Sequence, residues 1–155
     1  MFCPRKRVTF LPCLFLAWHI SKVSSICYYP DGTATNSDQP CLSGSEPSWC
    51  CGHGFICLDN KMCMATPQQL EADHGLAPYV RGSCTDKTWR DGNCPNFCVN
   101  GDAPVNDLLS GGMGMMKCQG TDEQVFYCVD GNMETVDCAA QKNVAVIVSG
   151  AKKTL

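Results

Sequence analysis

The amino-acid sequence predicts a small disulfide-rich protein made of two knottin-like cysteine knuckles, with short β-hairpins, one short helix and mostly irregular backbone. Three observations predict this class: a secretory leader, a dense and even set of cysteines after it, and few long apolar runs. An even number of cysteines in a short secreted chain indicates a disulfide framework. Because long apolar runs are scarce, we expect crosslinks to supply much of the stability that a hydrophobic core supplies elsewhere.

Residues 1–25 have the layout of a secretory signal peptide. Basic residues at positions 5–7 precede an apolar run over residues 8–18, and Val23 and Ser25 suit the last positions before a cleavage site. A bilayer span needs roughly 17–25 apolar residues, which is more than this run contains. A buried N-terminal helix is the alternative, but the cysteine-dense sequence that follows favours a leader. We therefore expect cleavage after Ser25 and a secreted, extracellular product. Association of this product with the cell wall is compatible with the same expectation.

Cleavage would remove Cys3 and Cys13 and leave twelve of the 14 cysteines. These twelve fall into two groups of six, on either side of a cysteine-free stretch at residues 64–82. All of them are expected to form disulfide bridges: Cys27, Cys41, Cys50, Cys51, Cys57, Cys63, Cys84, Cys94, Cys98, Cys118, Cys128 and Cys138.

This spacing predicts five segments along the chain. They are a signal peptide (1–25), a first six-cysteine module (26–64), a linker that holds a helix (65–82), a second six-cysteine module (83–140) and a C-terminal tail (141–155). The apolar run of the tail, at residues 144–148, is too short to span a membrane. We expect a final strand or a disordered end there.

The predicted mature chain is acidic. It keeps eight of the 12 Lys and Arg residues and all 15 Asp and Glu residues, which gives a net charge of about −7. Such a surface repels nucleic acid and anionic lipid. We therefore expect no nucleic-acid partner. We also expect no membrane span in this chain, and a monomer that binds protein or cell-wall polysaccharide.

The first module ends in the stretch WCCGHGFICLDNKMC, from Trp49 to Cys63. The dipeptide Asp59-Asn60 is a two-residue turn signal between apolar-rich segments. It predicts a β-hairpin whose strands are residues 55–58 and 61–64.

The adjacent cysteines of this stretch suggest a disulfide pairing. Neighbouring cysteines rarely bond each other, because the small ring would strain the peptide between them. A doublet followed by a hairpin that carries the last two cysteines is the layout of a cystine knot. Six cysteines allow fifteen pairings, and we favour the following as a hypothesis: Cys27–Cys51, Cys41–Cys57 and Cys50–Cys63.

The linker carries a helix signal. In Thr66-Pro67-Gln68-Gln69, Thr66 suits the N-cap and Pro67 the first helical position. Residues 70–73 continue the pattern, and Gly75 suits its end. We predict a helix of two turns between the two modules.

Two further elements are expected in the second module. Asp130-Gly131 predicts a hairpin between residues 125–129 and 132–136. The run SGGMGMMK, at residues 110–117, is rich in glycine and methionine and predicts a mobile, oxidisable loop. The alternative is that its methionines form a soft contact patch.

The sequence does not favour metal, redox or hydrolytic chemistry. In an oxidising compartment, thiols form disulfides before they bind zinc, and the mature chain has no C-x-x-C redox motif. His53 and His74 are its only histidines, and neither adjoins a serine nucleophile motif. We therefore expect no metal, no cofactor and no catalytic residues, and a protein that is not an enzyme.

Carbohydrate binding is the main alternative. The spacing CC-x₅-C in CCGHGFIC resembles hevein-type chitin-binding domains, which stack sugars on aromatic residues after the doublet. Aligned on the doublet, this chain places Gly52, Gly54 and Ile56 at the expected serine and aromatic positions. Phe55 is nearby, and Trp49 just before the doublet offers another ring.

The stretch YVRGSCTDKTWRDGNCPNFC, at residues 79–98, is rich in the side chains that anchor interfaces, namely Tyr, Trp and Arg. Trp89 has a second interpretation as the small core of the second module, with Arg81 or Arg90 stacked on its ring. With two aromatic residues of the first module, the candidate binding residues are Trp49, Phe55, Tyr79, Arg81, Trp89 and Arg90.

The segment CYYPDGT at residues 27–33, the knuckle at 49–63 and the stretch at 79–98 together resemble a family of ascomycete fungal cysteine-rich proteins, which are secreted or surface-anchored and largely uncharacterised. The resemblance covers residues 27–98 well and the rest loosely. Family members often carry a membrane span and a cytoplasmic tail after the cysteine region. The resemblance therefore implies either a freely secreted product or the truncated ectodomain of an anchored relative.

These observations favour a secreted, non-catalytic interaction module that acts at a cell surface or faces a host. One alternative is a module that binds cell-wall polysaccharide such as chitin, which retention on polymer beads would reveal. Another is a knottin-like hydrolase inhibitor, in which the loop at residues 43–48 would be the reactive segment.

Overall fold

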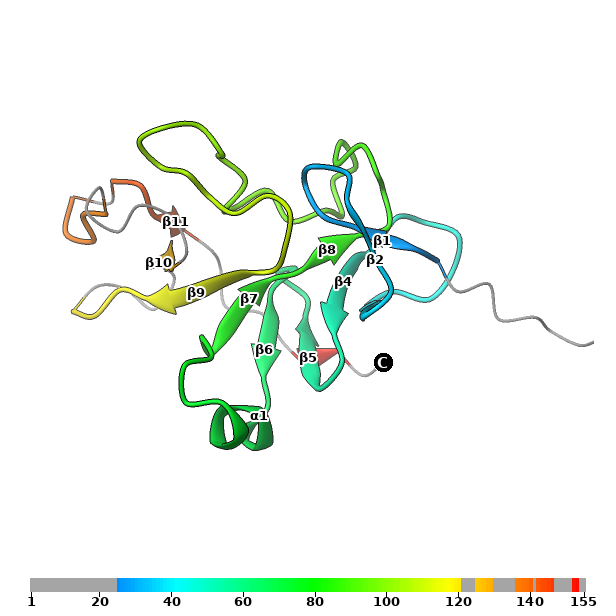
Figure 1. Cartoon of the computed structure of the whole chain (residues 1–155), viewed down its shortest axis with the longest axis horizontal. Helices are drawn as coiled ribbons and strands as arrows, with labels where there is room; N and C mark the ends of the chain where they lie inside the picture. The colour runs from blue at the N-terminus through cyan, green and yellow to red at the C-terminus, as the bar shows by residue number, and fades with distance from the viewer. Residues whose placement is uncertain (1–24, 121–124, 130–135, 141, 147–151, 154–155) are drawn as a thin grey trace, which may run out of the picture.

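Two antiparallel sheets form the fold (Figure 1). The structure is a computed structural model that describes residues 25–120, 125–129, 136–140, 142–146 and 152–153. Apart from Ser25, the predicted leader lies outside the described residues. Within the described ranges, there is no helix with the length and apolar character that crossing a bilayer requires.

The first sheet combines strands from both cysteine groups. Its order is β2-β1-β8-β4-β3. Strand β8 lies in the middle, because Cys84 is paired with Tyr28 on one side and with Trp49 on the other. The strand bounds are β1 Cys27–Tyr28, β2 Ala34–Thr35, β3 Asp38–Pro40, β4 Trp49–Gly52 and β8 Ser83–Cys84.

The second sheet has the order β11-β10-β9-β7-β6-β5-β12. Its hairpin of β5 and β6 confirms the one predicted around Asp59-Asn60. The bounds are β5 Phe55–Leu58, β6 Cys63–Ala65, β7 Tyr79–Arg81, β9 Met113–Lys117, β10 Val125–Cys128, β11 Ala145–Val146 and β12 Lys152–Lys153. Strand β11 falls in the tail, where a final strand was one of the two expectations.

The second predicted hairpin lies only partly within the described residues. Its first strand, predicted at 125–129, corresponds to β10, but the turn and most of the predicted second strand lie outside the described residues. The described neighbours of β10 are β9 and β11.

The methionine-rich face of the second sheet contributes side chains to one hydrophobic core. In cross-strand register, Ile56 pairs with Met64, Met64 with Tyr79, and Tyr79 with Met115. Side chains on such a row point to the same face of a sheet. Phe97 and Phe126 belong to the same buried cluster. The Tyr79 and Phe126 rings meet edge to face, with 5.3 Å between their centroids.

The prediction of a mobile loop at residues 110–117 was wrong. Met113 to Lys117 form β9, which pairs with β7 and β10, and Met113 and Met115 are fully buried. Methionine is flexible enough to fill irregular core gaps, and Gly114 points to the opposite face from its two methionine neighbours. Gly114 therefore leaves its own position on that face of β9 without a side chain, and it does not make the segment mobile.

The disulfides stay within the two predicted groups. Those of the first group are Cys27–Cys50, Cys41–Cys57 and Cys51–Cys63. Those of the second are Cys84–Cys94, Cys98–Cys128 and Cys118–Cys138. The prediction of a disulfide-rich fold with short strands and one short helix is confirmed. The molecule, however, is built of two curled antiparallel sheets, and it is not a clear pair of knottin knuckles.

The predicted pairing was right for Cys41–Cys57 and wrong for the doublet. Cys50 bonds Cys27 instead of Cys63, and Cys51 bonds Cys63 instead of Cys27. Both cysteines of the doublet lie in β4, where successive side chains point to opposite faces. Cys51 faces the cluster that contains Cys63, and Cys50 therefore faces the other way, toward β1.

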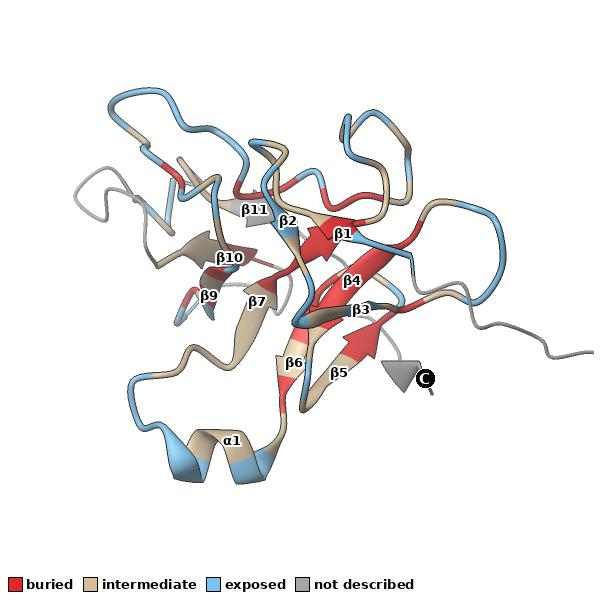
Figure 2. Cartoon of the chain, turned by 45° about the vertical axis from the view of Figure 1, so that its right-hand side comes forward, coloured by how far each residue is buried: buried red, intermediate tan, exposed pale blue. Residues whose placement is uncertain are grey.

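The linker helix is confirmed. Helix α1, Pro67–Ala72, has Thr66 as its N-cap, and the Thr66 side chain accepts a hydrogen bond from the Gln69 amide. Its C-cap is Asp73, two residues before the predicted Gly75. None of its residues is buried, and the helix lies at the edge of the molecule (Figures 1 and 2).

Candidate functional site

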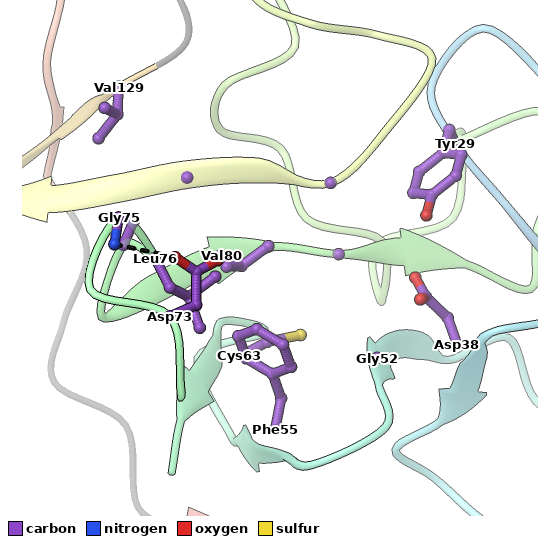
Figure 3. A pocket seen from close by; sticks show the side chains of 14 residues that line it. Tyr29, Asp38, Gly52, Phe55, Cys63, Asp73, Gly75, Leu76, Val80 and Val129 are labelled. Atoms are coloured by element: carbon purple, nitrogen blue, oxygen red, sulfur yellow. Dashed lines mark hydrogen bonds between the residues drawn. The ribbon is translucent and has the colours of Figure 1, made fainter. Parts of the chain in front are cut away.

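A groove lies where the two sheets meet (Figure 3). Its volume is about 360 Å³, within the usual range of small-ligand sites. It occupies the face of the second sheet opposite the methionine-rich core. The chain passes from one sheet to the other twice along this line, once after Gly52 at the end of β4 and once at Gly82 between β7 and β8.

The floor of the groove is apolar and rests on disulfides. Cys63, Val80 and Gly114 form its cross-strand row. Phe55 and Val80 pack against the buried cluster of bridged cysteines below. In that cluster, the Sγ atoms of Cys41 and Cys51, which belong to different bridges, are 3.4 Å apart. A floor that is tied by two touching covalent bridges cannot collapse easily to fill the groove.

Glycines keep the groove open. A Cβ atom at Gly114 would lie 3.0 Å from the Ala77 Cβ, and one at Gly112 would lie 3.3 Å from Val80 Cγ1. Glycine inside a strand often marks a site where a ligand or another backbone approaches closely. Residues 112 and 114 share one face of the chain, so larger side chains at these positions would project into the groove.

Two carboxylates and one phenol supply the polar side chains of the groove. In Figure 3, Asp38 and Asp73 lie toward opposite ends, and the Tyr29 hydroxyl points toward Asp38. Asp38 Oδ2 accepts a hydrogen bond from Ser83 Oγ at 2.6 Å, and Asp73 Oδ1 accepts one from the Gly75 amide at 2.9 Å. Among the described residues that line the groove, there is no Lys, Arg or His.

The candidate residues of the first module and Tyr79 occupy three different environments. Phe55 lines the groove. Trp49 is buried, with 3% of its surface exposed, so it does not present a ring to solvent. Tyr79 packs on the methionine-rich face, away from the groove.

The other candidates surround Trp89. The fully buried Arg81 lies with its guanidinium carbon 5.6 Å from the centre of the Trp89 ring, and it donates hydrogen bonds to the carbonyl oxygens of Gly82 and Leu108. Trp89 Nε1 donates to the Tyr28 carbonyl at 3.0 Å. Arg90 is exposed. Of the two stacks that the sequence allowed, the one with Arg81 is formed, and it ties the loop that carries Trp89 to both sheets.

Asp86 holds this loop in shape. The backbone amide of Thr88 and then its hydroxyl, followed by the amides of Asp91 and Arg90, lower the pKa of Asp86 from 3.8 to about 2. A carboxyl whose pKa is lower in the folded state stabilises that state fully above its unfolded pKa. This stabilisation is lost as the pH falls toward the folded pKa.

We expect the stability of the protein to fall between about pH 4 and pH 2, with Asp86 contributing part of the loss. Asp86→Asn removes the titrating charge, so this variant should be less stable than the wild type at pH 6 and should lose less of its stability over that window. Denaturant titrations at pH 6, 4 and 2 measure both effects. Asp102→Asn, at an exposed aspartate elsewhere, is the control. Equal pH profiles for wild type and Asp86→Asn would contradict the expectation.

The sulfur cluster and the histidines offer little to a metal or to catalysis. Cys41, Cys51 and Cys57 lie close enough together to suggest a metal site, but all three are half-cystines and have no thiolate to donate. His53 and His74 are both exposed.

The loop at residues 43–48 has an exposed tip and an anchored base. Residues 43–46 are exposed, whereas Ser48 is buried and its hydroxyl accepts a hydrogen bond from the Leu42 amide. Asn93 donates to the Pro47 carbonyl at 3.0 Å. This is the loop predicted as the reactive segment of a hydrolase inhibitor, and its exposed residues 43–46 include no aromatic or basic side chain.

Comparison with protein-family models, curated proteins and solved structures finds no match to this chain. Its function is therefore inferred from the geometry of the described residues.

Most groove residues were not among those chosen from the sequence. Asp38, Asp73 and Val80 belong to separate segments that only the fold brings together. One signal was available: Gly112 and Gly114 alternate with Met113 and Met115, and glycine inside a strand often marks a close approach of a ligand or another backbone.

Proposed function

We propose that this protein is a secreted, non-catalytic interaction module whose ligand binds in the groove between the sheets. The observation that carries the proposal is the groove itself, a preformed hollow with a glycine-lined, apolar floor above two disulfide bridges. Six disulfides are typical of extracellular proteins. A covalently held site loses little conformational freedom on binding, which favours recognition.

A non-catalytic role is part of the same proposal. The only groove groups that could exchange protons with a ligand are, among the described lining residues, two carboxylates at opposite ends and a tyrosine. This described lining contains no histidine, and its one cysteine, Cys63, is held in a disulfide and cannot act as a nucleophile. The resemblance to secreted or surface-anchored fungal proteins supports a cell surface as the place of action.

Polysaccharide binding remains the alternative at the same groove. One of its aromatic candidates, Trp49, is buried. Phe55 and Tyr29 are the two rings of the described groove lining. We favour a protein ligand because hydroxyl-rich sugars need more hydrogen-bonding side chains than this apolar floor supplies.

Filling the groove should strongly weaken binding to the target surface. Gly52 has an ordinary backbone conformation, and a Cβ there meets Asp38 and Phe55 at 3.5 Å, so Gly52→Leu should fold while occupying the Asp38 end. Fluorescently labelled mature protein would be titrated onto intact ascomycete cells, isolated walls, and chitin and glucan beads. We expect saturable binding to cells or walls that weakens about tenfold or more in Gly52→Leu.

Gly92→Leu is the matched control, because a Cβ atom at this position would have no neighbour within 4 Å and the residue is outside the groove. Near-UV circular dichroism would verify that both variants keep the native fold. If Gly52→Leu binds cells as tightly as the control does, the groove is not the site. Retention on chitin or glucan beads that Gly52→Leu removes would favour the polysaccharide alternative.

A further inference from the structure

We propose that the groove selects a short extended peptide that carries branched apolar side chains between two basic residues. This inference rests on the proposed function, because it names the ligand class of the same groove. Its starting point is the distribution of charge: the described lining has a carboxylate toward each end and no cation.

Each carboxylate keeps capacity for a ligand. Asp73 uses Oδ1 for the Gly75 amide, and its Oδ2 has no partner among the described residues. Asp38 accepts a strong bond at Oδ2 from the buried Ser83 hydroxyl, which fixes its orientation, and only a long contact of 3.4 Å at Oδ1 from Ser37. A fixed carboxylate with a free oxygen binds a Lys or Arg side chain by a charge-assisted hydrogen bond.

The floor between the carboxylates suits branched apolar side chains. Val80, Leu76 and Val129 are the branched apolar side chains of the lining, and Figure 3 shows Val80 and Leu76 close to Asp73. The glycine positions beside Val80 leave that face flat, so that a second backbone can approach closely. In an extended peptide, alternate side chains point to the same side. Such a peptide can place an apolar side chain on this floor while its flanking basic side chains reach the carboxylates at the two ends of the groove.

Charge complementarity decides between peptides and other amphiphiles. A single-headed amine lipid has one cation for two separated carboxylates, and a sugar has hydroxyls that the apolar floor cannot satisfy. A polyamine has enough cations but no branched side chains for the pocket around Val80. The acidic surface of the predicted mature chain, with a net charge of about −7, also attracts a basic ligand.

The test uses blocked, fluorescently labelled peptides of three series, each with one to four central residues. The first series has Lys at both ends and Leu or Val between, the second has Glu at both ends and the same centre, and the third has Lys at both ends and Ser between. Fluorescence anisotropy with the mature protein gives their affinities at low and physiological salt. We expect binding of the Lys–apolar series, weakening with salt, and at least tenfold weaker binding of the other two.

The variants Asp38→Asn and Asp73→Asn keep the shape of the side chain and remove its charge. Each should weaken the binding of the Lys–apolar peptides about three- to tenfold. In the double variant, the two losses of affinity should multiply. Asp102→Asn removes the same charge outside the groove and should change nothing. Unchanged affinity in the double variant, equal binding of the Glu series, or displacement by spermidine at the same concentration would each overturn the assignment of a basic peptide.

The failure of this inference and that of the proposed function give different results. If no peptide binds while Gly52→Leu still abolishes binding to cells, the groove is the site and its ligand is not a basic peptide. If Gly52→Leu binds both cells and peptides like the wild type, the groove has no binding role, and both proposals fall.

Discussion

Reduction of the six disulfide bridges is expected to unfold this protein. Ten of the 19 buried hydrophobic residues in the described part of the chain are half-cystines, so the interior consists largely of the crosslinks themselves. A disulfide contributes about 2–4 kcal/mol, mainly by restricting the unfolded chain. Six such contributions, if additive, come to about 12–24 kcal/mol, which is comparable to or larger than the roughly 5–15 kcal/mol by which domains are usually stable. The remaining aliphatic and aromatic core is too small to replace them.

Circular dichroism in the near ultraviolet, before and after reduction and alkylation in native buffer, measures this loss. The signal of the buried Trp49 should disappear on reduction. As a control, alkylation without reductant should leave the intact mass of the predicted mature chain unchanged, because its twelve cysteines are all paired. A reduced and alkylated protein that kept its near-ultraviolet spectrum would show that packing alone is sufficient.

Gly82→Ala is expected to be the most damaging single substitution along the seam of the sheets. A Cβ atom at this position would lie 2.0 Å from the Cys50 carbonyl oxygen and 3.0 Å from Cys63 Sγ. Neither atom can move freely, because both residues are disulfide-bonded and belong to strands. Overpacking of a rigid interior costs about 1–3 kcal/mol and sometimes more, and here the obstacle is backbone. We expect a loss of about 3 kcal/mol or more.

Urea titration of a graded glycine series measures this effect. Gly112→Ala, whose Cβ would meet the Val80 side chain at 3.3 Å, should cost less than Gly82→Ala, because a side chain can shift. Gly92→Ala, with nothing within 4 Å, should be close to neutral. The prediction concerns the order of stability of the three variants, so it can be tested even if Gly82→Ala yields no folded protein. Equal stability of Gly82→Ala and Gly92→Ala would contradict the close approach of the two sheets.

Local signals in the sequence predicted local structure well. Thr66 and Pro67 place the start of α1, and Asp59-Asn60 places the turn between β5 and β6, because a cap or a tight turn is satisfied by residues that adjoin it in the chain. The same kind of reasoning failed at residues 110–117. Glycine permits a mobile loop, but it also permits a strand with one flat face, and only the neighbouring strands distinguish the two.

The candidate site was predicted less well, for a physical reason. Phe55 was chosen and lines the groove, whereas Trp49 was chosen as a surface ring and is buried. The sequence shows that an aromatic residue is present, but its exposure depends on which strands cover it. Asp38 and Asp73 carry the charge of the groove, and nothing in their local sequence indicates that the fold sets them at opposite ends of one hollow.

The sequence by itself determined the class of molecule: a small, disulfide-rich chain whose bridges remain within two groups of cysteines. It did so because cysteine number and spacing are properties of the chain. The tertiary structure decided which cysteine of the doublet bonds Cys27 and which bonds Cys63, and where a ligand would fit. Neighbouring residues in a strand face opposite sides of a sheet, so partners and cavities depend on what each face meets, which only the packed sheets specify.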